Sequence, residues 1–214
     1  MRSLDNPATT LPRHLSVLVA LYLVASAGCS RSPGEALAAK TTTTANISDV
    51  RLLDLDGKPF DLKKSSTGRV HVVVFIRSDC PVSNRMAPEV RALWSNYHSK
   101  GADFYLIYVD PRETTDAIRA HLREFEYPCP ALRDLEHSLV AATGATVTPE
   151  AVVFDDKWSA TYRGRINNEF EELGKSRSAS TKHDLHDAIE ATLSGEPIAE
   201  PVTKAVGCYI SDLK

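Results

Sequence analysis

The 214-residue sequence lacks any long run of basic residues. Its 25 Lys and Arg residues are outnumbered by 28 Asp and Glu residues, and the formal net charge is -3. Proteins that bind nucleic acid hold its phosphates with clustered positive charge, so we exclude nucleic acid as the partner. Apolar residues make up 43% of the chain, which suffices for one ordinary domain with a sizeable core.

Cysteine is also scarce. The sequence has four widely separated cysteines, which are Cys29, Cys80, Cys129 and Cys208. This number and spacing exclude a small domain held together by disulfides and a zinc site built from paired Cys-x-x-Cys motifs. The sequence has no internal repeat, and His183 and His186 have no further cysteine or histidine beside them to complete a metal site.

The N-terminus has the features of a targeting segment. Basic residues precede an apolar run from Leu15 to Ala25, which is too short to span a bilayer comfortably. The sequence Ala-Gly-Cys that ends at Cys29 resembles the lipobox of bacterial lipoproteins, in which cleavage precedes a cysteine that is then lipidated. We therefore expect residues 1–28 to be a signal peptide and Cys29 to carry a lipid that anchors the protein to a membrane, facing the periplasm. Ordinary cleavage after residue 27 or residue 38 is the alternative, and it would give a secreted protein.

The rest of the chain divides into three parts. Residues 29–46 are rich in small and polar residues without an apolar period, and we expect a flexible tether. Residues 47–200 are expected to form the domain, and residues 201–214 a C-terminal tail that carries Cys208. An oxidising compartment outside the cytoplasm makes disulfide chemistry available to the remaining cysteines.

Strand patterns alternate with helix patterns along the domain, which predicts an α/β fold. Asp56-Gly57 lies between two short apolar segments and predicts an N-terminal β-hairpin. We expect strands at residues 50–53, 59–62, 69–76, 104–109, 151–154 and 160–163, and helices at residues 81–99, 114–125, 135–142 and 182–193. The last two strands form a closing antiparallel hairpin, and residues 174–180 are expected to be a loop. The prediction is a central mixed sheet flanked by helices.

A buried strand leads directly into Cys80-Pro81 at the start of a predicted helix. Proline suits the first turn of a helix, where no backbone donor is required. The free N–H groups and the dipole of the helix favour an anion there, so we expect a lowered pKa for the Cys80 thiol and a nucleophilic thiolate. Arg77 would add positive potential and Asp79 would oppose it. A buried, inert cysteine is the alternative.

A second loop, from Gly144 to Glu150, contains Thr148-Pro149, whose peptide bond is a candidate for the cis form. Strand-Cys-Pro-helix followed much later by Thr-Pro-strand resembles the thioredoxin superfamily. Over residues 50–168 the sequence is similar to its redoxin group, which includes the alkyl hydroperoxide reductase/thiol-specific antioxidant proteins and exported thioredoxin-like oxidoreductases. The resemblance implies a thioredoxin-like fold in which Thr148 and Pro149 face Cys80. With Pro81, they are the candidate substrate-binding residues.

Two departures from the family pattern bear on mechanism. Ser83 stands where a dithiol thioredoxin has its second cysteine, so the resolving thiol must come from elsewhere in the chain or from a partner. The resemblance to two-cysteine redoxins suggests Cys208 for this role, and packing of the tail is the alternative role of Cys208. Arg77 occupies the position where peroxiredoxins have Thr or Ser, which argues against peroxidase chemistry. Cys129, between two prolines, is expected to be a core residue.

The leading hypothesis is an exported thiol–disulfide oxidoreductase in which Cys80 attacks a disulfide and Cys208 or an external thiol resolves the mixed disulfide. Its partners would be a disulfide or thiol substrate protein and an external thiol reductant, and it needs neither a metal nor an organic cofactor. One alternative is a thiol peroxidase, in which Cys80 attacks a small peroxide. The other is a non-catalytic module that binds a partner at the membrane, with Cys80 incidental.

Overall fold

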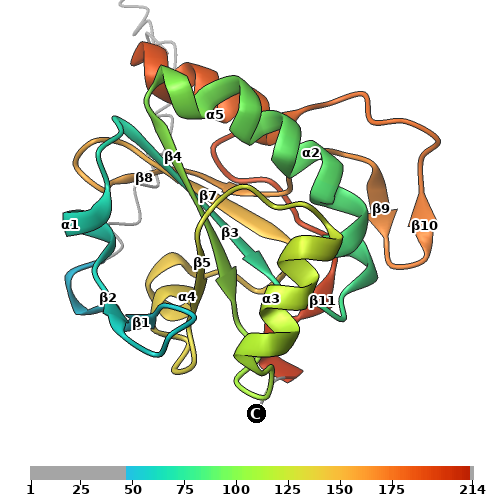
Figure 1. Ribbon diagram of the computed structural model, residues 1–214. Helices are drawn as coiled ribbons and strands as arrows, with labels where there is room; N and C mark the ends of the chain where they lie inside the picture. The colour runs from blue at the N-terminus through green and yellow to red at the C-terminus, as the bar shows by residue number, and fades with distance from the viewer. Residues whose placement is uncertain (1–46, 213–214) are drawn as a thin grey trace, which may run out of the picture. The chain divides into compact units, whose positions relative to one another are not determined.

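The fold is built on a central sheet that runs through the middle of the domain (Figure 1). It is seen in a computed structural model that describes residues 47–212, so the predicted signal peptide, Cys29 and the tether lie outside the described residues. The strands of the sheet are β1 (Leu52–Leu53), β2 (Pro59–Phe60), β3 (Val70–Ile76), β4 (Ala102–Tyr108), β5 (Ala131–Arg133), β7 (Glu150–Phe154) and β8 (Ala160–Gly164). Their order across the sheet is β2-β1-β5-β4-β3-β7-β8.

Parallel and antiparallel pairs are both present, as the prediction of a mixed sheet requires. β3 pairs in parallel with β4 and antiparallel with β7, and β8 follows β7 as the predicted hairpin. At the other edge β1 and β2 form the predicted N-terminal hairpin, with Leu52 opposite Phe60. All seven residues of β3 are buried, because both faces of the sheet are covered. This double burial explains why the β3 sequence shows no alternation of apolar and polar residues.

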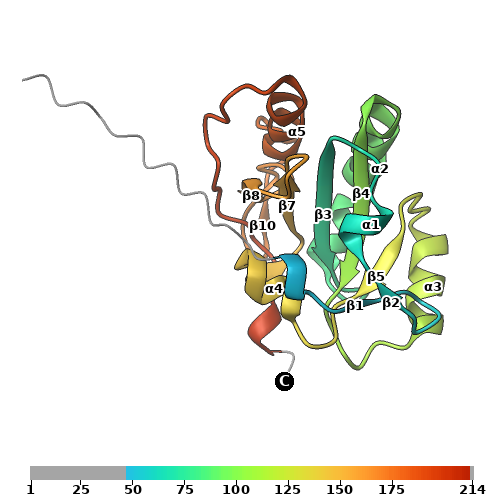
Figure 2. The same cartoon turned by 90° about the vertical axis from the view of Figure 1, so that its left-hand side faces the viewer.

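Helices cover both faces of the sheet. They are α1 (Leu62–Ser65), α2 (Pro81–Tyr97), α3 (Thr115–Glu124), α4 (Ser138–Thr143) and α5 (Asp184–Ser194), with 3-10 turns η1 (Ile47–Asp49), η2 (His98–Lys100) and η3 (Ile210–Asp212). One core cluster joins alternate residues of β3 to apolar side chains of α2, α3 and α5. The other joins the intervening residues of β3 to α1, α4 and η3. Figure 2 shows α1 and α4 in front of the sheet.

The predicted apolar stripe of α2 is confirmed. Met86, Val90, Leu93 and Tyr97 are all buried, and each recurs at helical spacing. Burial of each such side chain stabilises the fold by about 1.5–3 kcal/mol. The stripe fixes the rotation of α2 on the sheet, and it therefore also fixes the direction in which Cys80, at the start of the helix, points its thiol.

Local hydrogen bonding changes two of the predicted boundaries. α4 begins at Ser138 instead of Leu135, because the Asp134 carboxylate accepts the N–H groups of residues 138–140 and holds the preceding residues in a turn. The predicted loop at residues 174–180 contains β10 (Lys175–Ser176), which pairs with β9 (Phe170–Glu172). Strands of two or three residues are too short to show a recognisable alternation of apolar and polar residues in the sequence. Within residues 47–212, each helix is too short or too polar to traverse a bilayer.

Candidate active site around Cys80

Cys80 occupies the position that the sequence predicts, at the start of α2. β3 ends at Ile76, a short loop follows, and Cys80 is the extended N-cap residue with Pro81 in the first turn. The Cys80 carbonyl accepts the N–H of Asn84 at 3.0 Å, which is the first backbone hydrogen bond of the helix. The Cys80 side chain has no solvent exposure. Its reactivity therefore depends on the groups packed around the sulfur.

The loop of residues 144–150, which contains Thr148-Pro149, lies directly against the Cys80 sulfur. Cys80 Sγ donates a hydrogen bond to the carbonyl oxygen of Thr148 at 3.0 Å. The Thr148–Pro149 peptide bond is cis, as the sequence suggested. Thr148 and Cys80 are 68 residues apart in the chain, and the pairing of β3 with β7 brings them together.

Hydroxyl groups surround the sulfur. The Ser83 and Thr148 hydroxyls are buried and have no hydrogen-bond partner among residues 47–212 when the thiol is protonated. Burial alone would raise the pKa of the Cys80 thiol. Hydrogen bonds to the ionised sulfur from Cys208, from the Ser83 hydroxyl and N–H, and from Thr148 outweigh the burial, and they leave the pKa lowered. The expected direction of the shift is therefore confirmed, although burial opposes it.

The structure brings Cys208 to the same place. The tail forms a short strand, β11 (Cys208–Tyr209), which pairs antiparallel with β6 (Val147–Thr148) so that Cys208 lies opposite Thr148. Cys80 and Cys208 are both free thiols. Burial and the adjacent Cys80 thiolate raise the pKa of Cys208 to about 12, so Cys208 stays protonated at neutral pH and can donate to the thiolate.

Charges near Cys80 largely cancel one another. The Arg77 guanidinium, which the sequence suggested as a source of positive potential, binds the Asp79 carboxylate at 2.8 Å. It also lies 3.9 Å from the carboxylate of Asp110. Asp110 is also paired with the Arg112 guanidinium at 2.8 Å, so two basic groups face two acidic ones. The lowered pKa of Cys80 rests on short-range donors and does not need a net positive field.

A buried polar network supports the loop before Cys80. The Tyr108 hydroxyl lies 2.7 Å from His121 Nδ1, and His121 Nε2 lies 2.9 Å from Asn84 Oδ1. Asn84 Nδ2 in turn donates to the Ser78 carbonyl at 2.9 Å. The Glu113 carboxylate accepts the N–H of Ser78 at 2.8 Å, and burial raises the pKa of Glu113. The sequence did not indicate this network, because its members come from two separate stretches of the chain, residues 78–84 and 108–121.

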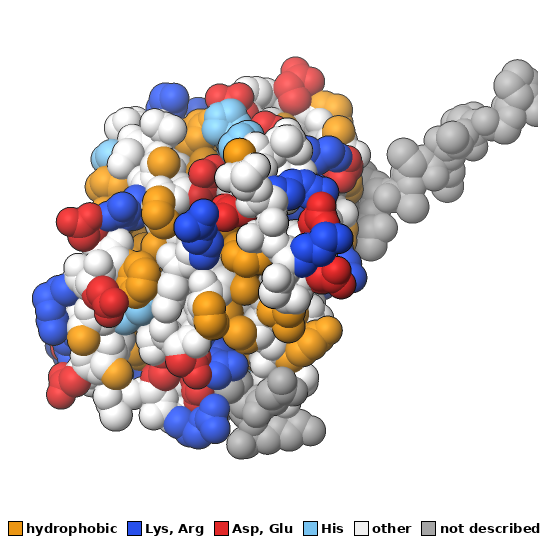
Figure 3. Space-filling view, turned by 90° about the vertical axis from the view of Figure 1, so that its right-hand side faces the viewer, with side chains coloured by type: hydrophobic (Ala, Val, Ile, Leu, Met, Phe, Trp, Pro, Cys, Tyr) orange, Lys and Arg blue, Asp and Glu red, His pale blue; other side chains and the backbone are white. Residues whose placement is uncertain are grey.

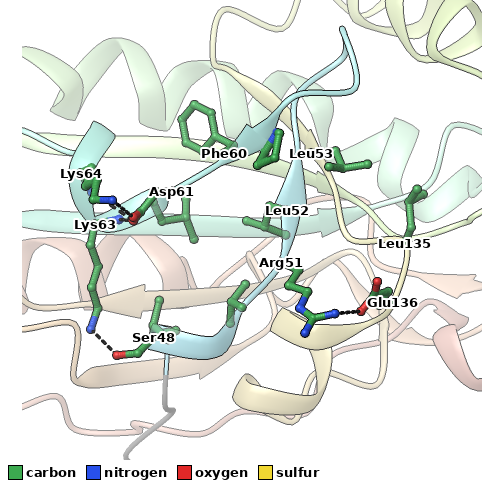
Figure 4. A pocket seen from close by; sticks show the side chains of 14 residues that line it. Ser48, Arg51, Leu52, Leu53, Phe60, Asp61, Lys63, Lys64, Leu135 and Glu136 are labelled. Carbon is green, nitrogen blue, oxygen red and sulfur yellow. Dashed lines mark hydrogen bonds and ion pairs between the residues drawn. The ribbon is translucent and has the colours of Figure 1, made fainter.

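Other sequence features lie away from the site. Cys129 is a core residue, as expected, and burial raises the pKa of its thiol to about 12. A hollow of about 850 Å³ lies beside the N-terminal hairpin (Figure 4). Its charged side chains are paired with one another or with Ser48, as in the contacts Arg51–Glu136 at 3.4 Å and Lys63–Ser48 at 3.2 Å. None of the residues that line it belongs to the surroundings of Cys80.

A model of the Redoxin family matches residues 39–177, more than half of the chain. No curated protein matches the sequence. An uncharacterized conserved protein from Geobacillus kaustophilus has a similar structure, with a TM-score of 0.66 and 25% identity over 75% of this chain and 87% of that one.

Two further solved structures are similar. A hypothetical protein from Sinorhizobium meliloti 1021 has a TM-score of 0.65 and 25% identity, over 75% of this chain and 92% of that one. A secreted Mycobacterium tuberculosis disulfide oxidoreductase, described as homologous to E. coli DsbE, has a TM-score of 0.50 and 18% identity, over 68% of this chain and 97% of that one. This last likeness confirms the predicted thioredoxin-like fold. Because the family model spans more than half of the sequence, and because the fold agrees with it, the chain belongs to the Redoxin family and is a thiol-based oxidoreductase.

Proposed function

We propose that the protein is an exported thiol–disulfide oxidoreductase in which Cys80 is the nucleophile and Cys208 is the resolving thiol. The observation that carries the proposal is that both thiols meet at Thr148. Cys80 donates to the Thr148 carbonyl at 3.0 Å, and Cys208 is paired with Thr148 across β6 and β11. Since the second cysteine of a dithiol motif is replaced by Ser83, Cys208 supplies the thiol that the motif lacks.

In the first step the Cys80 thiolate attacks one sulfur of a substrate disulfide. A bond forms between Cys80 and that sulfur, the substrate disulfide breaks, and its second sulfur leaves as a thiolate that takes up a proton. The donors from Cys208, Ser83 and Thr148 lower the pKa of Cys80 and so favour its thiolate before the attack. Thr148 contacts the sulfur, and Pro81 and Pro149 follow Cys80 and Thr148 in the chain, so we assign these three residues to substrate binding.

In the second step Cys208 attacks the Cys80 sulfur of the mixed disulfide. Cys208 loses its proton, the Cys80–Cys208 bond forms, and the substrate sulfur leaves as a thiolate and is protonated. Burial and the Cys80 thiolate both raise the pKa of Cys208, and the second cause disappears once Cys80 is bound to the substrate. Formation of the mixed disulfide therefore removes one of the two causes that keep Cys208 protonated. The substrate disulfide ends as two thiols, and an external thiol reductant returns the oxidised Cys80–Cys208 pair to the dithiol.

The proposed location follows from the N-terminal segment. Residues 1–28 have the pattern of a signal peptide, and Cys29 stands at the lipidation position. The similar Mycobacterium tuberculosis protein is described as secreted, which supports export of this chain as well. We propose a lipid anchor on Cys29, attachment to the membrane, and a domain that acts in the periplasm on disulfide or thiol proteins. Mass spectrometry of the full chain, recovered from membranes of the producing cells, would detect the lipid on Cys29.

A coloured aromatic disulfide such as dithiobis(nitrobenzoate) tests the two thiol roles. The reduced wild-type protein should release one equivalent of thionitrobenzoate rapidly and a second as the Cys80–Cys208 bond forms, and mass spectrometry without reductant should show the linked peptides. A Cys208→Ser variant should release one equivalent and keep the aromatic group on Cys80. If Cys80→Ser reacts as fast as the wild type, the assignment of Cys80 is wrong.

Reaction with hydrogen peroxide tests the peroxidase alternative. Stopped-flow mixing of the reduced protein with hydrogen peroxide should show oxidation no faster than that of free cysteine. A much faster, Cys80-dependent reaction would identify the protein as a thiol peroxidase instead.

A further inference from the structure

The C-terminal tail is fastened at two points. Upstream, the Thr203 N–H donates to the Arg163 carbonyl at 3.0 Å, and the Thr203 hydroxyl lies 2.6 Å from the Tyr162 hydroxyl. Downstream, the Ile210 N–H donates to the Thr146 carbonyl at 3.0 Å, and the Ile210 side chain is buried in the core. Residues 204–209, which we name the strap, run between these points.

The strap lies over the active site. Its β11 residues occupy the edge of β6 beside Thr148, and Cys80 beneath has no exposure to solvent. Val206 lies over a small hollow whose other apolar lining residues are Val82, Met86, Pro149, Ile166 and Phe170. Tyr209 remains 57% exposed on the outside of the strap. Figure 3, which views the side of the molecule that carries β9 and β10, shows exposed hydrophobic side chains interspersed with charged ones.

Gly207 is the point of closest approach between the strap and the active-site loop. A Cβ on residue 207 would lie 2.6 Å from the carbonyl carbon of Thr148 and 3.2 Å from the nitrogen of Pro149, and closer still to the Thr148 carbonyl oxygen. These are backbone atoms that cannot turn aside as the end of a side chain can. Only glycine allows the strap to lie this close.

We propose that Gly207 is the positioning residue that lets the strap dock, and that the strap alternates between a docked and a released state. This rests on the proposed function. In the docked state Cys208 lies against Cys80, where it can resolve a mixed disulfide, but Cys80 is closed to any polypeptide. In the released state Cys80 and the edge of β6 are open to a polypeptide disulfide. Because the docked strap covers Cys80, a polypeptide disulfide can reach Cys80 only after release, and Cys208 can resolve the mixed disulfide only when the strap moves back toward Cys80.

A Gly207→Ala substitution should change the equilibrium between the docked and the released state. Overlap of the new Cβ with the Thr148 backbone should shift the strap toward release, and an overlap of this kind typically changes such an equilibrium by about tenfold or more. We expect Cys80 to be alkylated by a bulky maleimide about tenfold faster in the variant. The second release of thionitrobenzoate, which reports Cys80–Cys208 bond formation, should be slower. Lys204→Ala, at an exposed position of the same strap, is the matched control and should change neither rate.

Cys129 reports whether the whole fold has loosened. Its thiol is buried in the core, so its alkylation should be unchanged by Gly207→Ala if the strap alone moves. Equal acceleration at Cys129 and Cys80, or an unchanged rate at Cys80, would overturn the proposal. An Ile210→Ala variant, which removes the buried downstream attachment, gives the same readouts should Gly207→Ala fold poorly. Alkylation needs no disulfide exchange, so failure of the proposed oxidoreductase function would leave this measurement informative.

Discussion

Removal of the Thr148 hydroxyl should make the Cys80 thiol a weaker acid. Thr148→Val keeps the branched shape of the side chain and its packing, but it deletes a buried hydroxyl that has no hydrogen-bond partner among the described residues except the ionised sulfur. A hydrogen bond to a charged group contributes about 1.5–3 kcal/mol. Even the lower figure corresponds to a roughly tenfold change in the acid dissociation constant of the thiol. We expect the pKa of Cys80 to rise accordingly, and Ser83→Ala to act in the same direction.

The ultraviolet absorbance of the thiolate, followed as a function of pH, measures this effect without requiring access to the buried sulfur. Cys129 and Cys208 do not interfere near neutral pH, because the pKa of each is raised to about 12. Subtraction of the titration curve of a Cys80→Ser protein removes any other contribution. Thr146→Val is the matched control, since Thr146 lies in the same loop and its hydroxyl is 3.4 Å from a Glu150 oxygen. Equal titration curves for Thr148→Val and the wild type would refute the argument that hydroxyl donors lower the pKa of Cys80.

Three further outcomes are expected. Cys208→Ala should raise the pKa of Cys80 more than Cys208→Ser does, because serine retains a donor; thiolate absorbance measures both. Asn84→Ala should lower the unfolding free energy by about 1–3 kcal/mol in urea denaturation, because it leaves the Nε2 atom of the buried His121 without its partner. Burial lowers the pKa of both His71 and His121, so the unfolded chain binds more protons than the folded chain as the pH falls through about 6.5. The unfolding free energy should therefore decrease between about pH 7 and pH 5, by at most ~1.4 kcal/mol per pH unit for each histidine, and a pH-independent value would contradict this.

The sequence was sufficient for the parts of the fold that local physics determines. The short β-branched run of β3 favours a strand buried on both faces, and the apolar spacing of α2 fixes its inward side. Cys80 followed by Pro81 at the junction of these two elements predicted the position of the candidate nucleophile. Each of these inferences uses residues that are neighbours in the chain.

The parts that the sequence did not reveal depend on contacts between distant segments. β11 is two residues long and pairs with an equally short β6, so neither strand has a detectable period. Ser83 was notable in the sequence only as the residue that replaces a second cysteine, whereas its hydroxyl and N–H both stabilise the thiolate. A serine three residues after an N-cap cysteine is a usable signal for such a donor, because the N–H groups of the first turn point at the N-cap side chain.

Burial and reactivity oppose each other at Cys80, and the arrangement of donors resolves the conflict. Ser83 belongs to α2 and Thr148 to β6, so these donors stay in place whether or not the strap is docked. Cys208 is the one donor that would leave with the strap, but release also exposes the sulfur to water and removes part of the burial that raises its pKa. The two changes act in opposite directions on the pKa. The pKa of Cys80 should therefore change less with the position of the strap than either change alone would make it.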